Sequence, residues 1–301
     1  MRSTVRGRGA VAARHAVAAW DVASPRRPSR LPGVTMAGFG VPSMAMPVRM
    51  IPHPGLTLVL DFGAGRPVVD GTTGRQRGSL VAGLGFGFGG VVLARGENVE
   101  CVQVRLSPLI ARAVLGVSPA DLEGTVVALE DVWGQEVERI RERLSQVSSW
   151  EARFAVADAL LTHRLRAGSA AGSSMDPEVA WAWRRIVAGR GLVRVEDLAA
   201  EVGWSRKRLW ARFRSQVGLR PKLAAKLVRF DHAVHRLVAG EGVADVAAGG
   251  GYADQSHLHR DVVALSGETP GTVVGEPFLA VDDVAWPRSP SARPPRLSTG
   301  R

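Results

Sequence analysis

The chain has 301 residues, of which 46% are hydrophobic and 22% charged, a balance typical of a globular protein with about two domains. No apolar run approaches the ~20 residues that a membrane-spanning helix needs, so a membrane protein is not expected. The one cysteine, Cys101, excludes a framework of internal disulfides and fits a reducing cytoplasm.

The net charge of +11 is unevenly distributed along the chain. Residues 1–45 carry seven arginines and one acid, whereas 46–175 carry thirteen bases and thirteen acids. Within 176–275, the stretch 202–230 holds nine Lys or Arg residues and no acid. That local field favours a phosphate backbone as partner, with a solvated basic face as the alternative. The neutral middle section excludes a general polyanion-binding surface there.

The N-terminal residues 1–45 are rich in Arg, Ala, Pro, Gly and Ser without a steady period. They predict a disordered or extended terminus, or sequence that precedes a later start such as Met36. Residues 46–166 are expected to form a β-rich regulatory or dimerisation domain, because short apolar runs such as "LTLVLDFG" and "VECVQVRL" alternate with glycine-rich turns.

Two helices should complete that domain. Val137, Ile140 and Leu144 form an apolar stripe at helical spacing, and "SSWE" at 148–151 predicts a capping box with Ser148 as N-cap. The stripe belongs either to the core or to a dimer seam. We favour the core.

The remaining chain divides into three parts. The small residues of "AGSAAGSSM" at 167–175 predict a linker. Asp176-Pro177 then opens the first helix of a domain over 176–275. The Pro-, Arg- and Ser-rich residues 276–301 predict a disordered tail.

An internal repeat marks the basic section. "LAAEVGWSRKRLWARF" (198–213) and "VAAGGGYADQSHLHRDV" (246–262) both place an alanine four residues before a glycine, then an aromatic residue and a helix-capping residue. The glycine supplies a positive φ that ends one helix, and Ser205 or Asp254 caps the next. Two such copies predict two helix-turn-helix units. Between them, 221–239 predicts a helix of roughly 27 Å, which can hold two recognition helices about one DNA turn apart.

These residues resemble the DNA-binding domain of AraC-type (AraC/XylS family) transcriptional regulators, from "VEDLAAEVGWSRKRLWARFRSQVGLRPK" to "VADVAAGGGYADQSHLHRDVVALSGETP". The resemblance implies a seven-helix domain, promoter DNA as partner and an N-terminal effector-sensing or dimerising domain. Residues 50–165 resemble, more loosely, the cupin-like sensor part of an actinobacterial subgroup. The glycines at 249–251 and Ser266 depart from the family pattern, so the second unit is expected to bind more weakly.

The candidate DNA-binding residues are those of the two recognition helices that point away from the apolar edge. In the first helix they are Ser205, Arg206, Lys207, Arg208, Trp210, Ala211 and Arg212. In the second they are Gln255, Ser256, His257, His259 and Arg260. By the resemblance, Lys207, Trp210 and Ala211 lie where bases are contacted, and Arg208 and Arg212 would contact phosphates or guanine edges.

Metal and enzymatic functions are not expected. His257 and His259 diverge by about 200° around a helix, so they do not converge on a metal ion. His232 and His235 are expected to face solvent or phosphate. The middle section offers only His53 and His163, too few for a metal cupin, and Cys101 lies in an apolar strand, where a buried structural thiol is expected.

The sequence therefore predicts an α+β protein: an N-terminal β-rich, cupin-like domain with a helical hairpin, and a C-terminal all-α domain with two helix-turn-helix motifs. We expect a cytoplasmic, nucleoid-associated transcriptional regulator without catalytic activity, cofactor or metal. Its expected partners are double-stranded promoter DNA, a small-molecule effector, a second copy of the chain and, for an activator, RNA polymerase, but no membrane. The alternatives are a ligand-independent dimeric regulator and a small-molecule-binding or enzymatic cupin with a DNA-binding appendage.

Overall fold

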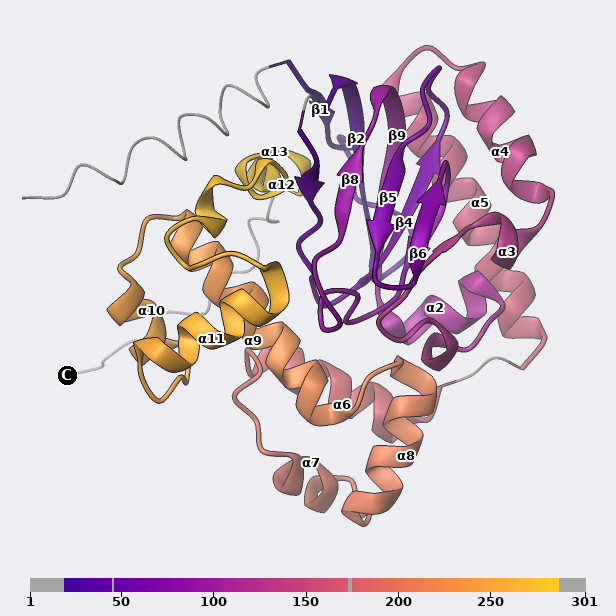
Figure 1. Ribbon diagram of the computed structural model, residues 1–301. Coiled ribbons are helices and arrows are strands. Elements are labelled where there is room, and N and C mark those ends of the chain that lie inside the picture. The colour runs from indigo at the N-terminus through magenta and orange to yellow at the C-terminus, as the bar shows by residue number, and fades with distance from the viewer. Residues whose placement is uncertain (1–18, 45, 173–174, 287–301) are drawn as a thin grey trace, which may run out of the picture.

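A computed structural model describes residues 19–44, 46–172 and 175–286 of the chain (Figure 1). An N-terminal β-rich part extends to helix α5, and a helical part follows, so the predicted α+β class is confirmed. Within the described residues, no helix is both long and apolar enough to cross a membrane.

Two antiparallel sheets form the β-rich part. The larger has the strand order β1-β2-β9-β4-β7-β10, and the smaller has the order β3-β8-β5-β6. The strands of the larger sheet are β1 (Asp21–Ala23), β2 (Val34–Ser43), β4 (Leu56–Asp61), β7 (Leu80–Ala82), β9 (Glu97–Leu106) and β10 (Val126–Ala128). Those of the smaller sheet are β3 (Val48–Arg49), β5 (Val68–Gly71), β6 (Gly74–Arg77) and β8 (Leu93–Arg95).

The larger sheet has two different apolar faces. Along β9, Val102, Val104 and Leu106 join the main core, whereas Val99 and Cys101 join a smaller cluster on the opposite face. This is the period of two that a strand imposes on its side chains. One face therefore packs against helices, and the other faces the smaller sheet.

Helices cover the main-core face of the larger sheet (Figure 1). They are α2 (Pro108–Leu115), the 3₁₀ helix η2 (Pro119–Leu122), α3 (Glu130–Trp133), α4 (Glu136–Ser145) and α5 (Trp150–Ala170). The predicted stripe on α4 belongs to the core, because Val137, Ile140 and Leu144 are all buried there. The structure thus favours the core alternative over a dimer seam.

The cap of α5 differs from the predicted one by one residue. Ser149, not Ser148, accepts a hydrogen bond from the Ala152 N–H. Glu151 does not reach back to form a capping box, because its carboxylate accepts a hydrogen bond from the Arg26 N–H instead.

The helical part consists of α6 (Pro177–Ala188), α7 (Val195–Glu201), α8 (Arg206–Val217), α9 (Pro221–Val238), α10 (Val243–Gly249) and α11 (Gln255–Ser266). The short helices η3 (Val273–Gly275), α12 (Pro277–Ala280) and α13 (Asp282–Ala285) follow. Asp176 occupies the predicted N-cap of α6, with Pro177 as the first helical residue. The Asp176 side chain makes no capping bond, because it pairs with Arg212.

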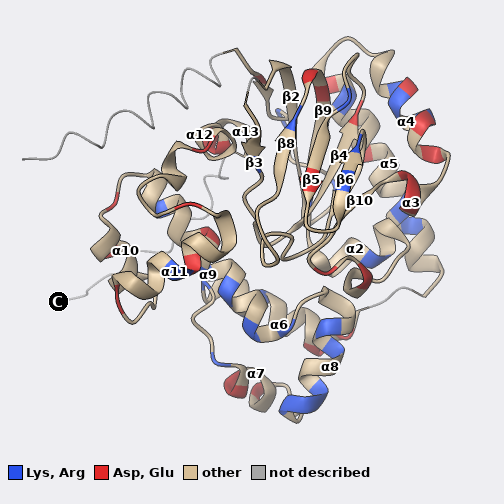
Figure 2. Cartoon of the chain, in the orientation of Figure 1, with Lys and Arg blue, Asp and Glu red and all other residues tan. Residues whose placement is uncertain are grey.

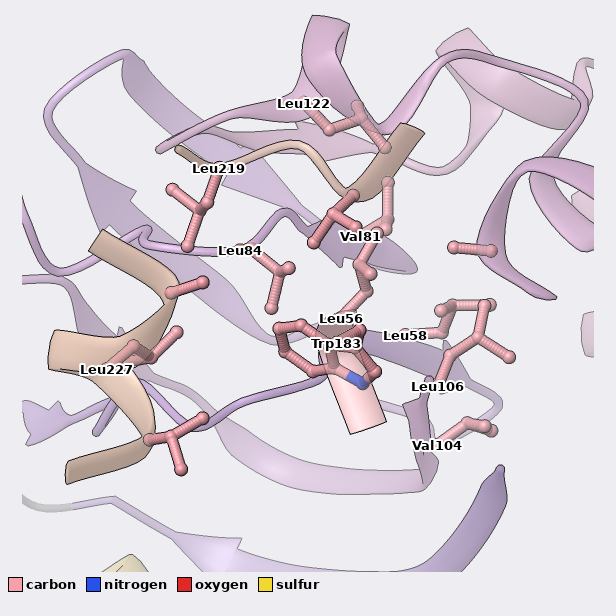
Figure 3. Close-up of a cluster of buried hydrophobic side chains, with 14 of the residues drawn as sticks. Leu56, Leu58, Val81, Leu84, Val104, Leu106, Leu122, Trp183, Leu219 and Leu227 are labelled. Carbon is pink, nitrogen blue, oxygen red and sulfur yellow. The ribbon is translucent and has the colours of Figure 1, made fainter. Parts of the chain in front are cut away.

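One continuous apolar core joins the two parts. Trp183, Leu219 and Leu227 of the helical part lie in the same cluster as Leu56 and Leu84 of the β-rich part (Figure 3). All five side chains are buried. Burial of a leucine stabilises a fold by roughly 1.5–3 kcal/mol. The two parts are therefore held together by packing.

Three predicted segment boundaries are corrected by the structure. Within 1–45, residues 21–23 and 34–43 are strands β1 and β2, and β2 pairs with β9 along most of its length. The predicted linker at 167–175 begins too early, since α5 continues to Ala170. Within 276–301, α12 and α13 pack against the β-rich part, whereas 1–18 and 287–301 lie outside the described residues.

The reason for these errors is that small and polar residues do not exclude long-range pairing. In β2, Gly38 is required because a side chain there would collide with Trp150 of α5. A Cβ atom added to Gly38 would lie only 2.3 Å from Cε3 of Trp150. The composition of 34–43 resembles a loop, but its glycine serves close packing between a strand and a helix.

We predict that Gly38→Val lowers the free energy of unfolding by roughly 1–3 kcal/mol, because the new side chain overpacks the contact with Trp150. Chemical denaturation measures the loss. Thr35→Val, on an exposed position of the same strand, serves as the matched control and should leave the free energy of unfolding nearly unchanged. Equal stabilities of both variants would show that 34–43 is not a packed strand.

Candidate nucleic-acid interface and interdomain cavity

The first helix-turn-helix is formed by α7 and α8. Gly203 adopts φ 66° between them, a conformation that favours glycine. Ser205 is the N-cap of α8 and accepts a hydrogen bond from the Arg208 N–H at 3.2 Å. Leu209 and Phe213 are fully buried, so the opposite side of α8 faces outward.

The second unit repeats this geometry with α10 and α11. Gly251 adopts φ 69°, and Asp254 caps α11 by accepting a hydrogen bond from the His257 N–H at 2.7 Å. Leu258 and Val262 are buried. Both predicted turns and both predicted caps are thus present.

The departures from the family pattern have local explanations. A Cβ on Gly249 would lie 2.9 Å from Nη1 of Arg236, whose guanidinium donates to the carbonyls of Asp245 and Val246. Gly249 thus lies against the flexible end of a side chain that holds α10. Ser266 is buried, and its hydroxyl donates to the Val262 carbonyl at 2.7 Å.

A basic groove runs from α8 across α9 to α11. Eight bases line it: Arg194, Arg206, Lys207, Arg214, Arg220, Lys222, Lys226 and Arg229. Glu196 and Asp261 are the acids on its walls. Figure 2 shows the concentration of Lys and Arg on α8. The groove lies between the two recognition helices and carries the charge expected for phosphate contacts.

Acids from outside 202–230 neutralise part of this field. Glu196 pairs with Arg206 at 3.4 Å, and Glu123 of the β-rich part pairs with Arg214 at 2.8 Å. Asp261 contacts both Lys226 and Arg229 at 3.0 Å. Asp176 accepts two hydrogen bonds from Arg212, each of 2.7 Å, which hold the pKa of that carboxyl below its usual range.

Four Lys or Arg residues of the stretch 202–230 have no carboxylate within ion-pair distance among the described residues: Lys207, Arg208, Arg220 and Lys222. Two of these bases stack on aromatic rings. The Arg208 guanidinium lies 4.3 Å from the centre of Trp204, and that of Arg220 lies 5.0 Å from the centre of Trp210. Trp210 is 41% exposed, which is unusual for so large an apolar side chain.

The predicted DNA-binding residues are exposed, with one exception. His257 is half-buried, because its ring packs edge-on against Tyr252, with ring centres 5.3 Å apart. Gln255, Ser256, His259 and Arg260 are exposed on α11. The structure therefore brings the predicted residues to the outer sides of α8 and α11, and gives Arg212 and His257 intramolecular contacts that the sequence does not reveal.

An apolar cavity lies between the two sheets and helix α9. Its free volume is about 80 Å³. Apolar side chains such as Phe39, Val59, Val69 and Phe86 form most of its wall. The polar side chains at the wall are His53, Thr57, Gln103, Arg105, Asp231, His235 and Asp282. The β-rich part, α9 and the C-terminal residues 278–286 all contribute to it.

An ion-pair network crosses the cavity wall. Asp282 accepts a hydrogen bond from Arg105 of β9 at 2.7 Å and bonds to Nε2 of His235 on α9 at 2.8 Å. Burial alone would lower the pKa of His235, but the bond to Asp282 and the charge of Asp231 raise it to about 9. His53 bonds to Thr57 at 2.8 Å, and its burial and the charge of Arg105 hold its pKa well below the usual range.

The sequence did not reveal this network. His235 was expected to face solvent or phosphate, but it is largely buried and bonded to Asp282, so that expectation is wrong. Arg105, His235 and Asp282 are far apart in the chain, and no local spacing connects them. Arg105 itself gives no distinct signal, because β9 also carries the polar residues Glu97, Glu100 and Gln103.

Metal ligation and thiol chemistry find no support in these positions. Within the described ranges, no three His, Cys, Asp or Glu side chains are placed to hold a metal ion. Cys101 is buried, as expected, and burial raises the pKa of its thiol. His163 is exposed on α5.

We predict that stability decreases as the pH rises from about 6.5 towards 9. The folded-state pKa of His235 lies above its ordinary value, so its contribution is complete below about 6.5 and is lost as the pH passes about 9. The shift corresponds to roughly 3 kcal/mol. Thermal unfolding across this range tests the prediction, and the decrease should be smaller in His235→Gln. The same slope in both proteins would contradict it.

Comparison with known proteins identifies the helical part. Residues 198–275 match the model of a helix-turn-helix domain family, and no curated protein matches the sequence. The solved structures that resemble the chain include an apo ToxT variant from Vibrio cholerae strain SCE256, at 9% identity and a TM-score of 0.47, over 82% of this chain and 98% of that one.

Two further solved structures are similar. ToxT of the same strain bound to an unsaturated fatty acid is 9% identical, with a TM-score of 0.41, over 86% of this chain and 95% of that one. The AraC-like transcriptional activator CuxR is 16% identical, with a TM-score of 0.31, over 80% of this chain and 96% of that one. At TM-scores below 0.5, these likenesses do not establish a shared fold. The match with the family model assigns a helix-turn-helix domain to residues 198–275 of the chain.

Proposed function

We propose that the two helix-turn-helix units enter successive major grooves of promoter DNA and bind it sequence-specifically, while the β-rich part senses a small-molecule effector. The observation that supports DNA binding most directly is the basic groove between α8 and α11. In a DNA duplex, backbone phosphates lie between two consecutive major grooves. The basic side chains of α9 lie between α8 and α11, where those phosphates would be if each recognition helix entered one major groove.

Phosphate contacts are assigned first to the Lys and Arg residues that have no acidic partner in the described chain. Lys207 and Arg208 are at the start of α8, and Arg220 and Lys222 are at the start of α9. Stacking on Trp204 and Trp210 limits the rotamers of Arg208 and Arg220, so less side-chain entropy is lost on binding. Arg206 and Arg212 are weaker candidates, because a carboxylate already pairs with each.

Base recognition is assigned to Trp210 and Ala211, by their place in the AraC-type pattern. Lys207 shares that place in the pattern, but it is assigned to a phosphate because no carboxylate of the described residues pairs with it. The exposed indole of Trp210 offers an apolar surface to a thymine methyl group. On α11 the candidates are Gln255, Ser256, His259 and Arg260. His257 is a weaker candidate, because its ring packs on Tyr252. Ser205 caps α8 with its oxygen and retains a hydroxyl proton for a phosphate.

The cavity supports the sensing role. An apolar wall with a few polar groups at one side is the usual character of a small-molecule site. The cavity adjoins α9, the helix that also lines the basic groove, so a ligand there would act on an element of the DNA-binding surface. A ligand-independent regulator that only dimerises remains the alternative. It predicts neither a thermal shift nor a change in DNA affinity with any metabolite.

The helix-turn-helix units also suggest where the protein acts and which other molecules it contacts. A regulator of this kind acts on the nucleoid in the cytoplasm, as a monomer or a pair of chains, and contacts RNA polymerase if it activates. Placement in an actinobacterial subgroup rests on the looser resemblance of residues 50–165 alone.

We expect the double variant Lys207→Ala/Arg208→Ala to bind DNA more weakly and with a smaller salt dependence. Loss of two phosphate contacts reduces the slope of log K against log salt by about 2. Fluorescence anisotropy between 50 and 200 mM salt, on a duplex selected in vitro with the wild-type protein, measures the slope.

Arg143→Ala/Arg166→Ala provides the control, because it removes two exposed arginines of α4 and α5 that do not line the basic groove. This variant should keep the wild-type slope. Wild-type affinity that does not change with salt would refute the proposed interface altogether.

A second prediction concerns specificity. Trp210→Ala should weaken binding to the selected duplex by roughly tenfold to a hundredfold and to a scrambled duplex by much less, since a lost base contact affects only the matched sequence. His257→Ala should discriminate between the two duplexes almost as well as the wild type. If both variants lose equal affinity on matched and scrambled DNA, neither residue reads sequence.

A further inference from the structure

The C-terminal segment, defined as residues 276–286, returns from the helix-turn-helix domain to the β-rich part. Val281 and Ala285 are buried in one small cluster with Phe39 and Cys101. Phe278 packs against this cluster and also against the second small cluster, which contains residues of the opposite sheet. The segment thus occupies the space between the two sheets with an aromatic ring.

The same segment supplies Asp282, whose carboxylate is the only one among the described residues that pairs with both Arg105 and His235 at the cavity wall. Asp282 lies between Arg105 and His235, at 2.7 and 2.8 Å. Trp286 adds a second contact, with its ring centre 4.1 Å from the Arg105 guanidinium carbon. The Arg105 Nε atom is buried and has no hydrogen-bond partner within the described part of the chain. The polar end of the cavity is therefore organised around one anion from the segment.

The size of the cavity indicates that it is already partly filled. Its 80 Å³ holds a few water molecules, whereas ligand pockets usually measure roughly 300–1,000 Å³. Phe278, Leu279, Asp282 and Trp286 all contribute to its wall. Without these side chains the space would extend to the ring position of Phe278 and to the carboxylate position of Asp282.

We propose that the C-terminal segment acts as an internal ligand of the sensor site, and that the effector is a molecule with an apolar body and one anionic head that displaces it. The apolar body takes the place of Phe278, and the anionic head takes the place of Asp282 between Arg105 and His235. This inference rests on the proposed sensing role of the β-rich part. Segment and effector then exclude each other.

An anionic head follows from the charges that displacement leaves behind. Arg105 would lose its acidic partner Asp282, and a buried cation without a counter-ion is strongly unfavourable. His235 would keep only Asp231, whose backbone carbonyl bonds to Nδ1 and whose carboxylate lies 3.7 Å away. A neutral ligand could replace the ring of Phe278 but would leave Arg105 unpaired.

Displacement would also change how the two parts are joined. Asp282 connects β9 to α9 through its two bonds, and α9 is the helix between the two recognition helices. An effector whose anionic head binds both Arg105 and His235 would connect β9 to α9 in place of Asp282. The C-terminal segment would then no longer be held against the sheet. Effector binding is thereby coupled to the element that spaces the two DNA-reading units.

The test uses two dyes with the same aromatic skeleton and no DNA. 1-Anilinonaphthalene-8-sulfonate carries an anionic head, and N-phenyl-1-naphthylamine lacks it. In the full-length protein, Phe278→Ala should bind both dyes about tenfold more tightly than the wild type, because the segment competes less well for the site. Fluorescence titration measures both affinities, and circular dichroism confirms that each variant retains the native fold.

Two additional variants test the assignment in the Phe278→Ala background. Arg105→Gln should remove the increase in affinity for the sulfonate dye and leave the affinity for the neutral dye unchanged. This result is expected if the Arg105 guanidinium binds the sulfonate group. Ala94→Phe, which fills the cavity wall on β8, should remove the gain for both dyes, as expected if they occupy this cavity.

Equal dye affinities in the wild type and Phe278→Ala would overturn the inference, and so would a gain that survives Ala94→Phe. A sulfonate affinity unchanged by Arg105→Gln would overturn the anionic head. These outcomes are independent of DNA binding. A chain that binds the dyes as expected but binds DNA without salt dependence would instead refute the proposed regulator.

Discussion

The alternation of side chains along β4 and β9 is the constraint on which the rest of the structure depends. Leucines and valines at every second position build the core that α4 and α5 share with the helix-turn-helix domain. The intervening positions, including Thr57, Val59 and Arg105, face the cavity. A slip of one residue in register would exchange these two sets. The same strands therefore fix the helix-turn-helix domain on one face and the candidate sensor site on the other.

Attachment of the helical part also explains the position of α8. Its C-cap, Gly218, fits against η2 so closely that a Cβ would lie 2.6 Å from the Pro119 carbonyl. Arg214 pairs with Glu123 beside this contact, and the Ser118 hydroxyl donates to the Ser215 carbonyl. The first recognition helix is thus in contact with the β-rich part through backbone, charge and hydrogen bond. A change in the β-rich part therefore has a direct physical route to the first helix-turn-helix unit.

The sequence predicted what is local and missed what is distant. Turn glycines, the caps Ser205 and Asp254 and the apolar edges of α8 and α11 lie within a few residues of one another, so their spacing alone determined both helix-turn-helix units. Strand β2 was missed, because its pairing with β9 spans more than fifty residues and its glycine appears loop-like in isolation. The ion pairs of Asp282 and Asp176 depend in the same way on the completed fold.

Charge illustrates this difference most clearly. Residues 202–230 contain no acid, and the sequence therefore indicates an uncompensated basic field. In three dimensions, acids from four other elements or loops approach five of its nine bases, and the remaining field is concentrated at the starts of α8 and α9. An acid-free run is a property of the chain, whereas a phosphate binds the potential in space. Arg212, which belongs to the run but is held by Asp176, therefore contributes less to that potential than Lys207, five residues earlier on the same helix.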